Sequence, residues 1–399
     1  MTLLPIDQAL IKVTESLKIL SSDKVSVAKA LNRVLTEDIF AKLTQPPFSS
    51  SAMDGYAVRA EDLNSIPVTL DVTGESAAGH SFSKPVQKCQ AVRIFTGAPV
   101  PEGADTVIMQ ENTTREGDKV TITVGNDIGA NIRPKGTDFN QGDVLLKSGT
   151  ILTAKDLALA AAMNWGVLNV RRKPVIAVLA TGDELVEPGE TPNPDQIISS
   201  IPSGLVSMIE NWGAEALYLG IAKDNETSLR EKISKGLAAD ILITIGGASV
   251  GDHDLVQKVL RDLGMDLNFW KVAIRPGKPI MHGQLGDTHV LGLPGNPVSA
   301  FICAEIFLRE MIGKLLGTDC NNHNIVQAFL AEELSSNGPR QHYMRASTKQ
   351  RDDGLLDVIP AASQDSSLLK TYASSDCLIV RSPHAPPAKR GEVVDIILI

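Results

Sequence analysis

The sequence predicts a multidomain protein of the α/β plus β class, with a parallel-sheet α/β domain and smaller β domains. Two continuous apolar runs, Val175–Leu179 and Ile241–Ile245, alternate with helical periodicity, which is typical of parallel strands buried on both faces of a sheet. Short alternating strands separated by Gly and Pro occupy residues 68–124 and 323–399, which indicates two β units. The chain of 399 residues leaves room for these parts at about 150 residues per domain.

The N-terminal residues are expected to be helical. Apolar residues recur every three or four positions from Ile6 to Leu20, and Val27–Leu31 continues in the same style, so both segments predict helices. The segment Thr44–Ser51 contains two consecutive prolines and cannot be a regular element. After the first β unit, the glycine-rich residues 125–150 predict turns, and an alanine-rich helix is expected at 153–165 with Thr153 as its N-cap.

From Pro174 onward, strands and helices alternate. Besides the two apolar runs, the pattern predicts strands at Ala216–Ile221, Phe269–Ile274, Pro279–His282 and Val290–Leu293, and helices at Pro202–Trp212, Glu226–Leu237, Leu255–Leu263 and Pro297–Leu316. The alternation predicts a parallel sheet covered by helices. The final strands, from Val326 to Leu398, belong to the second β unit.

Composition and charge exclude several classes of protein. A net charge of −9 and an aromatic content of 4% argue against a nucleic-acid-binding surface. The sequence has no apolar stretch of 18 residues and no signal-peptide pattern at its start, so no membrane span or secretion signal is expected. The cysteines at 89, 303, 320 and 377 form no CxxC pair, so a cytoplasmic location is expected.

Three polar loops follow the apolar strands. They begin at Thr181, Gly246 and Pro294, and they should meet at one sheet edge because the carboxyl ends of parallel strands lie together. The glycines of the second loop suit a phosphate cradle or an ordinary strand-to-helix turn. Pro294 and Pro297 suit a helix start that faces the same crevice or a purely geometric one.

Charged residues near these loops suggest a metal and an anion. Asp183, Glu184, Asp252 and Asp254 are hard oxygen ligands that suit Mg²⁺ bridged to a substrate phosphate, although loop acids are usually only solvated. Positive charge at a Pro-Gly turn comes from Lys271, Arg275 and Lys278. These cations could clamp an anion or belong to a solvated turn.

Six motifs, in order, resemble the molybdopterin molybdenumtransferase family, which is related to the E domain of gephyrin. They are Ser51-Ala-Met-Asp-Gly-Tyr-Ala57, Thr96-Gly-Ala-Pro-Val-Pro101, Thr181-Gly-Asp-Glu-Leu185, Gly246-Gly-Ala-Ser-Val-Gly251, Pro276-Gly-Lys-Pro279 and Leu293-Pro-Gly-Asn-Pro297. The resemblance covers essentially the whole chain. It implies a discontinuous helical and linker domain (residues 1–40 and 141–172), an inserted β domain (41–140), an α/β molybdopterin-binding domain (173–322) and a C-terminal β-barrel-like domain (323–399).

The resemblance also implies an activity. Family members insert molybdate into adenylylated molybdopterin with release of AMP, the final step of molybdenum cofactor synthesis, and a divalent metal, expected to be Mg²⁺, assists. Carried over by motif, the expected catalytic residues are Asp54, Thr96, Glu184 and Asp254, with Glu184 and Asp254 holding the metal. Expected substrate contacts are Asp138, Gly246, Gly247, Ser249, Gly251, Lys271, Arg275, Lys278, Pro294, Pro297, Arg345 and Ser367.

Further expectations concern partners and alternatives. The resemblance implies a homodimer in which the α/β crevice of one subunit faces the β domains of the other, with a molybdopterin adenylyltransferase and apo-molybdoenzymes as possible partners. The chain departs from the family pattern at Ser199-Ser200-Ile201. Two other functions stay open at this point, namely the preceding adenylylation of molybdopterin and a non-catalytic scaffold.

Overall fold

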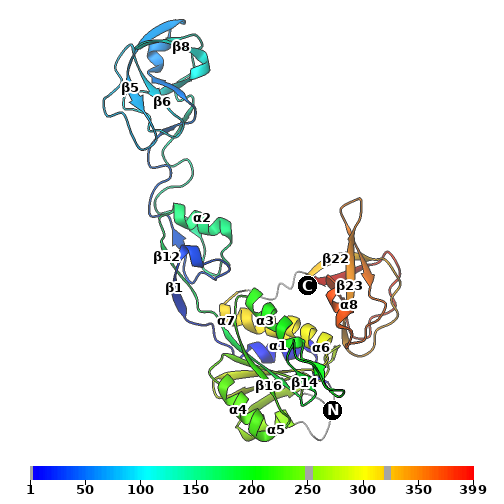
Figure 1. Cartoon of the computed structure of the whole chain (residues 1–399). Helices are drawn as coiled ribbons and strands as arrows, with labels where there is room; N and C mark the ends of the chain where they lie inside the picture. Colours follow the sequence, from blue (N-terminus) through cyan, green and yellow to red (C-terminus); the bar gives the residue numbers. More distant parts are fainter. Residues whose placement is uncertain (1–2, 248–254, 319–324) are drawn as a thin grey trace. The chain divides into compact units, whose positions relative to one another are not determined.

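A computed structural model of the chain describes residues 3–247, 255–318 and 325–399, and the chain divides into two compact units (Figure 1). Unit 1 comprises Met1–Asp23, Asn32–Val34 and Val170–Ile399, and unit 2 comprises Lys24–Leu31 and Leu35–Asn169. Two of the boundaries between the units fall within β1 (Ser22–Ser26) and β12 (Val167–Arg171).

Unit 2 contains a six-stranded sheet in the order β7-β4-β6-β5-β9-β8. Its strands are β4 (Gly55–Val58), β5 (Val68–Ser76), β6 (Gln90–Ile94), β7 (Thr106–Met109), β8 (Thr113–Glu116) and β9 (Lys119–Ile122). Tyr56, Leu70 and Ile108 are buried together on one face. Gly55 has no room for a side chain, because a Cβ there would lie 1.8 Å from the Ile108 carbonyl oxygen. The predicted β unit at residues 68–124 is therefore confirmed.

Short elements make up the rest of unit 2. They are η1 (Val27–Lys29), β2 (Ile39–Phe40), β3 (Ser50–Ser51), η2 (Ala60–Leu63), η3 (Gln110–Asn112), β10 (Ile132–Arg133), β11 (Val144–Leu146) and α2 (Ala154–Ala162). Helix α2 begins after Thr153, as predicted, and the Asp156 carboxylate accepts hydrogen bonds from the Thr153 N–H (2.8 Å) and hydroxyl (2.7 Å). The helix predicted at Val27–Leu31 is wrong, because only a 3₁₀ turn forms, at Val27–Lys29, where the Val27 N–H donates to the distant Gly166 carbonyl (3.1 Å).

The larger sheet of unit 1 has the order β16-β13-β17-β21-β20-β18. Its strands are β13 (Val175–Thr181), β16 (Glu215–Ala222), β17 (Ile241–Ile245), β18 (Asp266–Trp270), β20 (Met281–Leu285) and β21 (Thr288–Leu293). The first four strands in this order pair in parallel, which confirms the predicted parallel arrangement. Strand β20 runs antiparallel to both of its neighbours, β21 and β18, and a two-residue turn at Gly286 and Asp287 joins it directly to β21.

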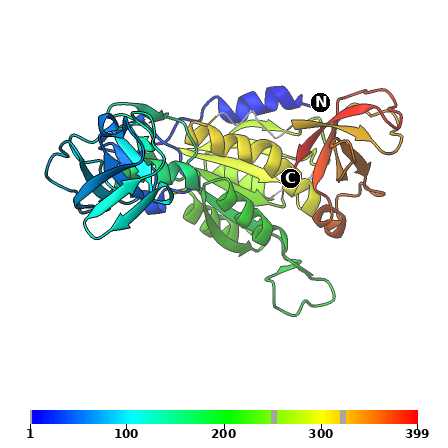
Figure 2. The ribbon, with the colours of Figure 1, turned by 90° about the horizontal axis from the view of Figure 1, so that it is seen from above.

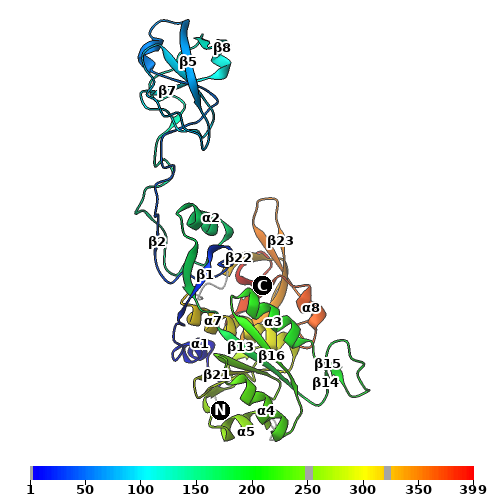
Figure 3. The ribbon, with the colours of Figure 1, turned by 60° about the vertical axis from the view of Figure 1, so that its left-hand side comes forward.

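Helices cover both faces of this sheet (Figures 1 and 3). One face carries α4 (Glu226–Gly236) and α5 (Leu255–Asp262). The other carries α1 (Ile6–Thr14), α3 (Ile201–Asn211) and the long helix formed by α6 (Pro297–Cys303), the π-helical η4 (Ala304–Leu308) and α7 (Arg309–Leu316). The long helix matches the predicted Pro297–Leu316. Helix α1 packs in this core and so belongs to unit 1; the four implied domain boundaries stay predictions.

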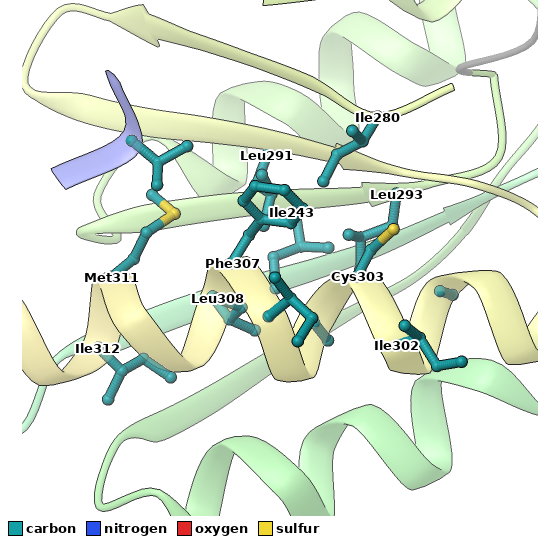
Figure 4. Close-up of a cluster of buried hydrophobic side chains, with 14 of the residues drawn as sticks. Ile243, Ile280, Leu291, Leu293, Ile302, Cys303, Phe307, Leu308, Met311 and Ile312 are labelled. Carbon is teal, nitrogen blue, oxygen red and sulfur yellow. The ribbon is translucent and has the colours of Figure 1, made fainter. Parts of the chain in front are cut away.

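Between the long helix and the sheet lies a cluster of buried hydrophobic side chains (Figure 4). Ile243 and Leu291 point from the sheet towards Phe307 and Met311 of the helix, and all four are fully buried (Figure 4). Burial of this kind stabilises the fold by roughly 1.5–3 kcal/mol per side chain. Figures 2 and 3 show one segment that projects from unit 1, between β14 (Leu185–Val186) and β15 (Ile197–Ile198).

The C-terminal strands form a sheet that closes on itself. Its order is β19-β23-β24-β22-β26-β25, and an additional pairing of β23 with β25 completes the closure, which confirms the barrel-like expectation. Its elements are β19 (Ile274–Arg275), β22 (Ile325–Leu330), β23 (Gln341–Gln350), β24 (Leu356–Pro360), α8 (Leu369–Ala373), β25 (Cys377–Arg381) and β26 (Val393–Leu398). The single strand predicted at Phe269–Ile274 is wrong. Lys271, at φ 76°, breaks it, and β19 joins the barrel instead.

Candidate functional site

Three strand-ending loops of unit 1 converge at the carboxyl edge of the large sheet. The Gly246 N–H donates to the Leu293 carbonyl oxygen (3.1 Å). A Cβ on Gly246 would lie 2.9 Å from the Thr181 carbonyl oxygen, and a Cβ on Gly295 would lie 3.7 Å from the Gly246 Cα. Gly246 and Gly247 have φ values of 91° and 62°, which glycine adopts without strain. The loops after β13, β17 and β21 therefore meet where parallel strands predict a ligand crevice.

Acidic side chains line the same edge. The Glu184 carboxylate lies over Gly182, where an added Cβ would be 2.3 Å from Glu184 Oε2. The backbone N–H of Asp224 donates to Asp183 Oδ1 (3.2 Å), and that of Asp183 donates to Asp224 Oδ2 (3.4 Å). The sequence analysis missed Asp224, although it follows the predicted strand Ala216–Ile221 just as the other acids follow theirs.

Part of the predicted site lies outside the described residues, namely Ser249, Gly251 and Asp254. Within the described residues, no three His, Cys, Asp or Glu side chains gather into a metal-binding group. Mg²⁺ commonly takes one or two protein carboxylates and completes its octahedron with water and substrate phosphates. Glu184, an exposed carboxylate at the crevice, suits that mode of binding.

The three predicted cations follow β18, between the large sheet and the barrel. Lys271 Nζ lies 3.6 Å above the Trp270 ring, and Arg275 pairs with His342 of β23 in parallel register. Lys278 follows the turn at Pro276 and Gly277, and its carbonyl accepts from the Val272 N–H (3.1 Å). Over the described ranges, no carboxylate forms an ion pair with Lys271, Arg275 or Lys278.

Arg345 and Ser367 lie in and beside the barrel, close to these cations. Arg345 is only 1% exposed. Its guanidinium donates to the carbonyls of Ser363 (3.2 Å) and Leu368 (3.5 Å), while its Nε has no hydrogen-bond partner. Ser367 donates its N–H (2.9 Å) and hydroxyl (2.8 Å) to Asp365 Oδ1. These two bonds hold the pKa of Asp365 below its usual range.

The same loop contacts the start of α6. Asn296 Nδ2 donates to the Ser366 hydroxyl (3.1 Å), and the Val298 N–H donates to the Ser366 carbonyl (3.1 Å). Pro297 is the first residue of α6, and Pro294 is buried. The barrel loop takes up one of the N–H groups at this helix start, and whether the helix start binds a ligand in the crevice stays a prediction. The contact places that loop against the carboxyl edge of the sheet.

Positive charge concentrates where β19 meets the barrel. Burial, together with Arg275, Arg340, Arg345 and Arg381, lowers the pKa of His342 to about 4. Burial and Arg275 likewise lower the pKa of Arg340. Such a concentration of guanidinium groups favours an anion. Sequence analysis missed Arg340 and Arg381, because barrel pairing alone brings them beside Arg275.

In unit 2, Asp54 and Thr96 lie together although 42 positions separate them. The Thr96 N–H and hydroxyl both donate to Asp54 Oδ1, at 2.7 Å and 2.8 Å. These two bonds, aided by the charge of Arg93, hold the pKa of Asp54 below its usual range. Asp138 is exposed on a separate loop, where its N–H donates to the Gln45 carbonyl (3.1 Å).

The fold and site define an α/β protein with a strand-end crevice, an accessory β domain and a C-terminal barrel. Three family models match in order: "MoeA N-terminal region (domain I and II)" over residues 4–164, "Probable molybdopterin binding domain" over 177–314 and "MoeA C-terminal region (domain IV)" over 327–399. The chain therefore belongs to the MoeA family, whose curated relatives are named molybdopterin molybdenumtransferase.

These relatives match over most of their length. The chain is 36% identical to the molybdopterin molybdenumtransferase of Haemophilus influenzae, over 99% of this chain and 98% of that protein. It is 38% identical to that of Nostoc sp., over 86% of this chain and 80% of the relative. The crystal structure of a molybdopterin biosynthesis MoeA protein from Pyrococcus horikoshii is similar with a TM-score of 0.84 and 31% identity, covering 100% of this chain and 99% of the other.

Proposed function

We propose that this chain inserts molybdate into adenylylated molybdopterin and releases AMP, the final step of molybdenum cofactor synthesis. The observation that carries the proposal is the convergence, inside unit 1, of the loops that follow β13, β17 and β21, with Glu184 after β13 and with Arg275 and Lys278 in the segment after β18. Membership of the MoeA family identifies the chemistry that such a crevice would perform.

This reaction must bring two anions together, namely molybdate and the substrate with its phosphates. These anions repel one another. Arg275, Lys278 and Arg345 would offset that repulsion, because cations fixed by the protein need no reorganisation during the reaction. Ser367 and the backbone around Gly246 and Gly247 would add hydrogen bonds. Holding molybdate next to the dithiolene would contribute much of the rate by proximity.

We propose Mg²⁺ as the metal, held by Glu184 and, outside the described residues, by Asp254. Bound there, it would supply positive charge to the phosphoanhydride that is cleaved. Glu184 contributes a hard oxygen ligand at the crevice. Beside it, the carboxylates of Asp183 and Asp224 each accept a hydrogen bond from the other residue's backbone N–H. These acids would keep the loops after β13 and β16 in place while substrate binds.

We further propose that the protein acts in the cytoplasm as a homodimer. The described cysteines 89, 303 and 377 are free thiols, which suits a reducing compartment. None of the described helices is long and apolar enough to cross a membrane. In the dimer, Asp54 and Thr96 of one subunit would complete the crevice of the other, with Asp138 near the nucleotide. The partners would be a molybdopterin adenylyltransferase upstream and apo-molybdoenzymes downstream.

The decisive experiment is to incubate the purified chain with adenylylated molybdopterin, molybdate and Mg²⁺ and to follow AMP release. We expect release that requires both molybdate and the metal and no added ATP. Turnover of ATP with free molybdopterin would instead favour the adenylylation step. No AMP release, with the substrate nevertheless bound, would favour a scaffold.

A further inference from the structure

A half-buried arginine in unit 2 joins the two segments that carry Asp54 and Thr96. Arg93 lies in β6, three residues before Thr96, and faces Tyr56 of β4 in antiparallel register. Its Nη1 donates to the Gly55 carbonyl (2.9 Å), and its Nη2 donates to Gln110 Oε1 (2.8 Å). Gln110 in turn donates its backbone N–H to the Asp54 carbonyl (3.0 Å). The guanidinium therefore bridges the Gly55–Tyr56 peptide and the Gln110 side chain, and the Gln110 backbone in turn bonds to the neighbouring Asp54–Gly55 peptide.

Aromatic rings hold the guanidinium in this position. Its central carbon lies 5.2 Å from the Tyr56 ring centroid and 4.8 Å from that of Phe95. Tyr56 is only 4% exposed, so one side of the stack is part of the core. A planar, fork-shaped cation between two rings loses little further entropy when it makes two directed hydrogen bonds. Lysine could not reproduce this geometry.

The charge of Arg93 is not used in an ion pair. Both of its hydrogen-bond acceptors are neutral oxygens, and in the part of the chain that is described no carboxylate lies within ion-pair distance of it. The nearest strand neighbour with a charge is Glu75, which pairs with Arg93 in register across β5 and β6 and is exposed. The guanidinium can therefore act on Asp54 through its field as well as through the peptide.

We propose that Arg93 is a positioning residue for the Asp54–Thr96 pair: it ties the Gly55 carbonyl to the Gln110 side chain, and Gln110, whose N–H holds the Asp54 carbonyl, thereby keeps the Asp54 carboxylate against Thr96. The pair's part in catalysis rests on the proposed function, whereas the clamp itself does not. Arg93 makes no contact with a reacting group in this assignment. Its role is to keep the segment that carries Asp54 in place, so that the carboxylate stays aimed at Thr96.

Three variants of the full chain separate charge from bridging. Arg93→Gln removes both, Arg93→Lys keeps the charge but cannot bridge both acceptors, and Arg115→Gln removes an exposed arginine from β8 of the same sheet as a control. The first readout is the Asp54 carboxyl pKa, followed by carbon NMR and assigned with Asp54→Asn. The second is the hydrogen-exchange rate of the Gln110 backbone N–H, which donates to the Asp54 carbonyl. Thermal unfolding monitors the fold.

We expect the Asp54 pKa to rise in Arg93→Gln and to stay near that of the parent chain in Arg93→Lys. Gln110 amide exchange should quicken about tenfold in both variants, the loss expected for one hydrogen bond, with no change in Arg115→Gln. If the Asp54 pKa and the Gln110 exchange are both unchanged in folded Arg93→Gln and Arg93→Lys, the clamp is wrong. If these readouts shift but the parent chain releases no AMP, the proposed function fails while the clamp stands.

Discussion

Asp54 and Glu184 are both expected catalytic carboxylates, but the protein holds them differently. Asp54 accepts two hydrogen bonds from Thr96, which keep it ionised and fix its direction. The Glu184 side chain instead lies over the glycine that ends β13. A glycine at that position leaves room for the carboxylate, which any side chain at 182 would displace.

Replacing Glu184 with Gln should lower AMP release by on the order of 10²-fold or more, because the amide keeps the shape and loses the charge that a metal requires. Circular dichroism and thermal unfolding should match the parent chain, since the side chain is exposed. The control is Glu210→Gln, which makes the same chemical change at an exposed position of α3. Equal activity of the Glu184 variant and this control would remove Glu184 from the mechanism.

His282 should make stability depend on pH. It is fully buried, and burial, with a smaller effect from His289, lowers its pKa to about 3. The folded state therefore keeps the ring neutral while the unfolded chain binds a proton below pH about 6.5. Because the unfolded state binds more protons, stability falls as pH falls, by roughly 1.4 kcal/mol per pH unit between pH 6.5 and 3.

Urea unfolding of unit 1 at pH 5, 6 and 7 measures this effect. The slope of unfolding free energy against pH should be smaller in His282→Gln than in the parent chain. Replacing His80, an exposed histidine, should leave the slope unchanged. Equal slopes in the parent chain and His282→Gln would show that this ring does not titrate on unfolding.

At the level of elements, β19 has the largest consequence for the site. This strand of two residues, Ile274 and Arg275, leaves the α/β sheet and pairs with β23 of the barrel. Through this pairing, Arg275 lies near His342, the residue that also feels the charges of Arg340, Arg345 and Arg381. Contacts of Asn296 and Val298 with Ser366 fix the opposite side of the same junction.

Removing the cations of this junction should weaken substrate binding. Arg275→Ala and Lys278→Ala are each expected to raise KM for adenylylated molybdopterin about tenfold, since a charge-assisted hydrogen bond to an anion contributes roughly 1.5–3 kcal/mol. The loss should be larger at low salt, where screening is weaker. Lys18→Ala, an exposed lysine of unit 1, serves as control. An unchanged KM at every salt concentration in both variants would mean that the turn is merely solvated.

For the whole molecule, the two groups of predicted catalytic residues belong to different compact units. Asp54 and Thr96 lie in unit 2, and Glu184 lies in unit 1. A symmetric dimer carries two equivalent composite sites when each site takes one group from each subunit. This arrangement is the one we propose, and it makes a quantitative prediction for mixed dimers.

Asp54→Ala and Glu184→Gln chains, each inactive alone, should regain activity when they are unfolded together and refolded. Random pairing makes about half of the dimers mixed, and each mixed dimer has one intact site of two, so about one quarter of parent activity is expected. If one chain supplied both residues, every site would carry a lesion. A silent mixture in which tagged pull-down confirms mixed dimers would contradict the shared site.

Sequence reasoning was most successful where local chemistry decides structure. The apolar runs Val175–Leu179 and Ile241–Ile245 form parallel strands because continuous apolar strands must be buried on both faces. Thr153 starts α2 because its side chain and Asp156 satisfy the first N–H groups. The convergence of the loops at Thr181 and Gly246 follows from strand direction alone.

Only the tertiary structure decided features that depend on distant partners. The Val27 N–H bonds to the distant Gly166 carbonyl, and β19 pairs with the barrel instead of extending β18; each outcome depends on an acceptor or strand that is far away in sequence. Arg340 and Arg381 join Arg275 through barrel pairing, and Arg93 reaches Gly55 and Gln110 across three strands. The sequence by itself determined the family, the order of elements and the crevice loops, because these follow from local pattern. Which charges surround the crevice was decided by tertiary packing, because Coulomb interactions depend on distance in space rather than on separation along the chain.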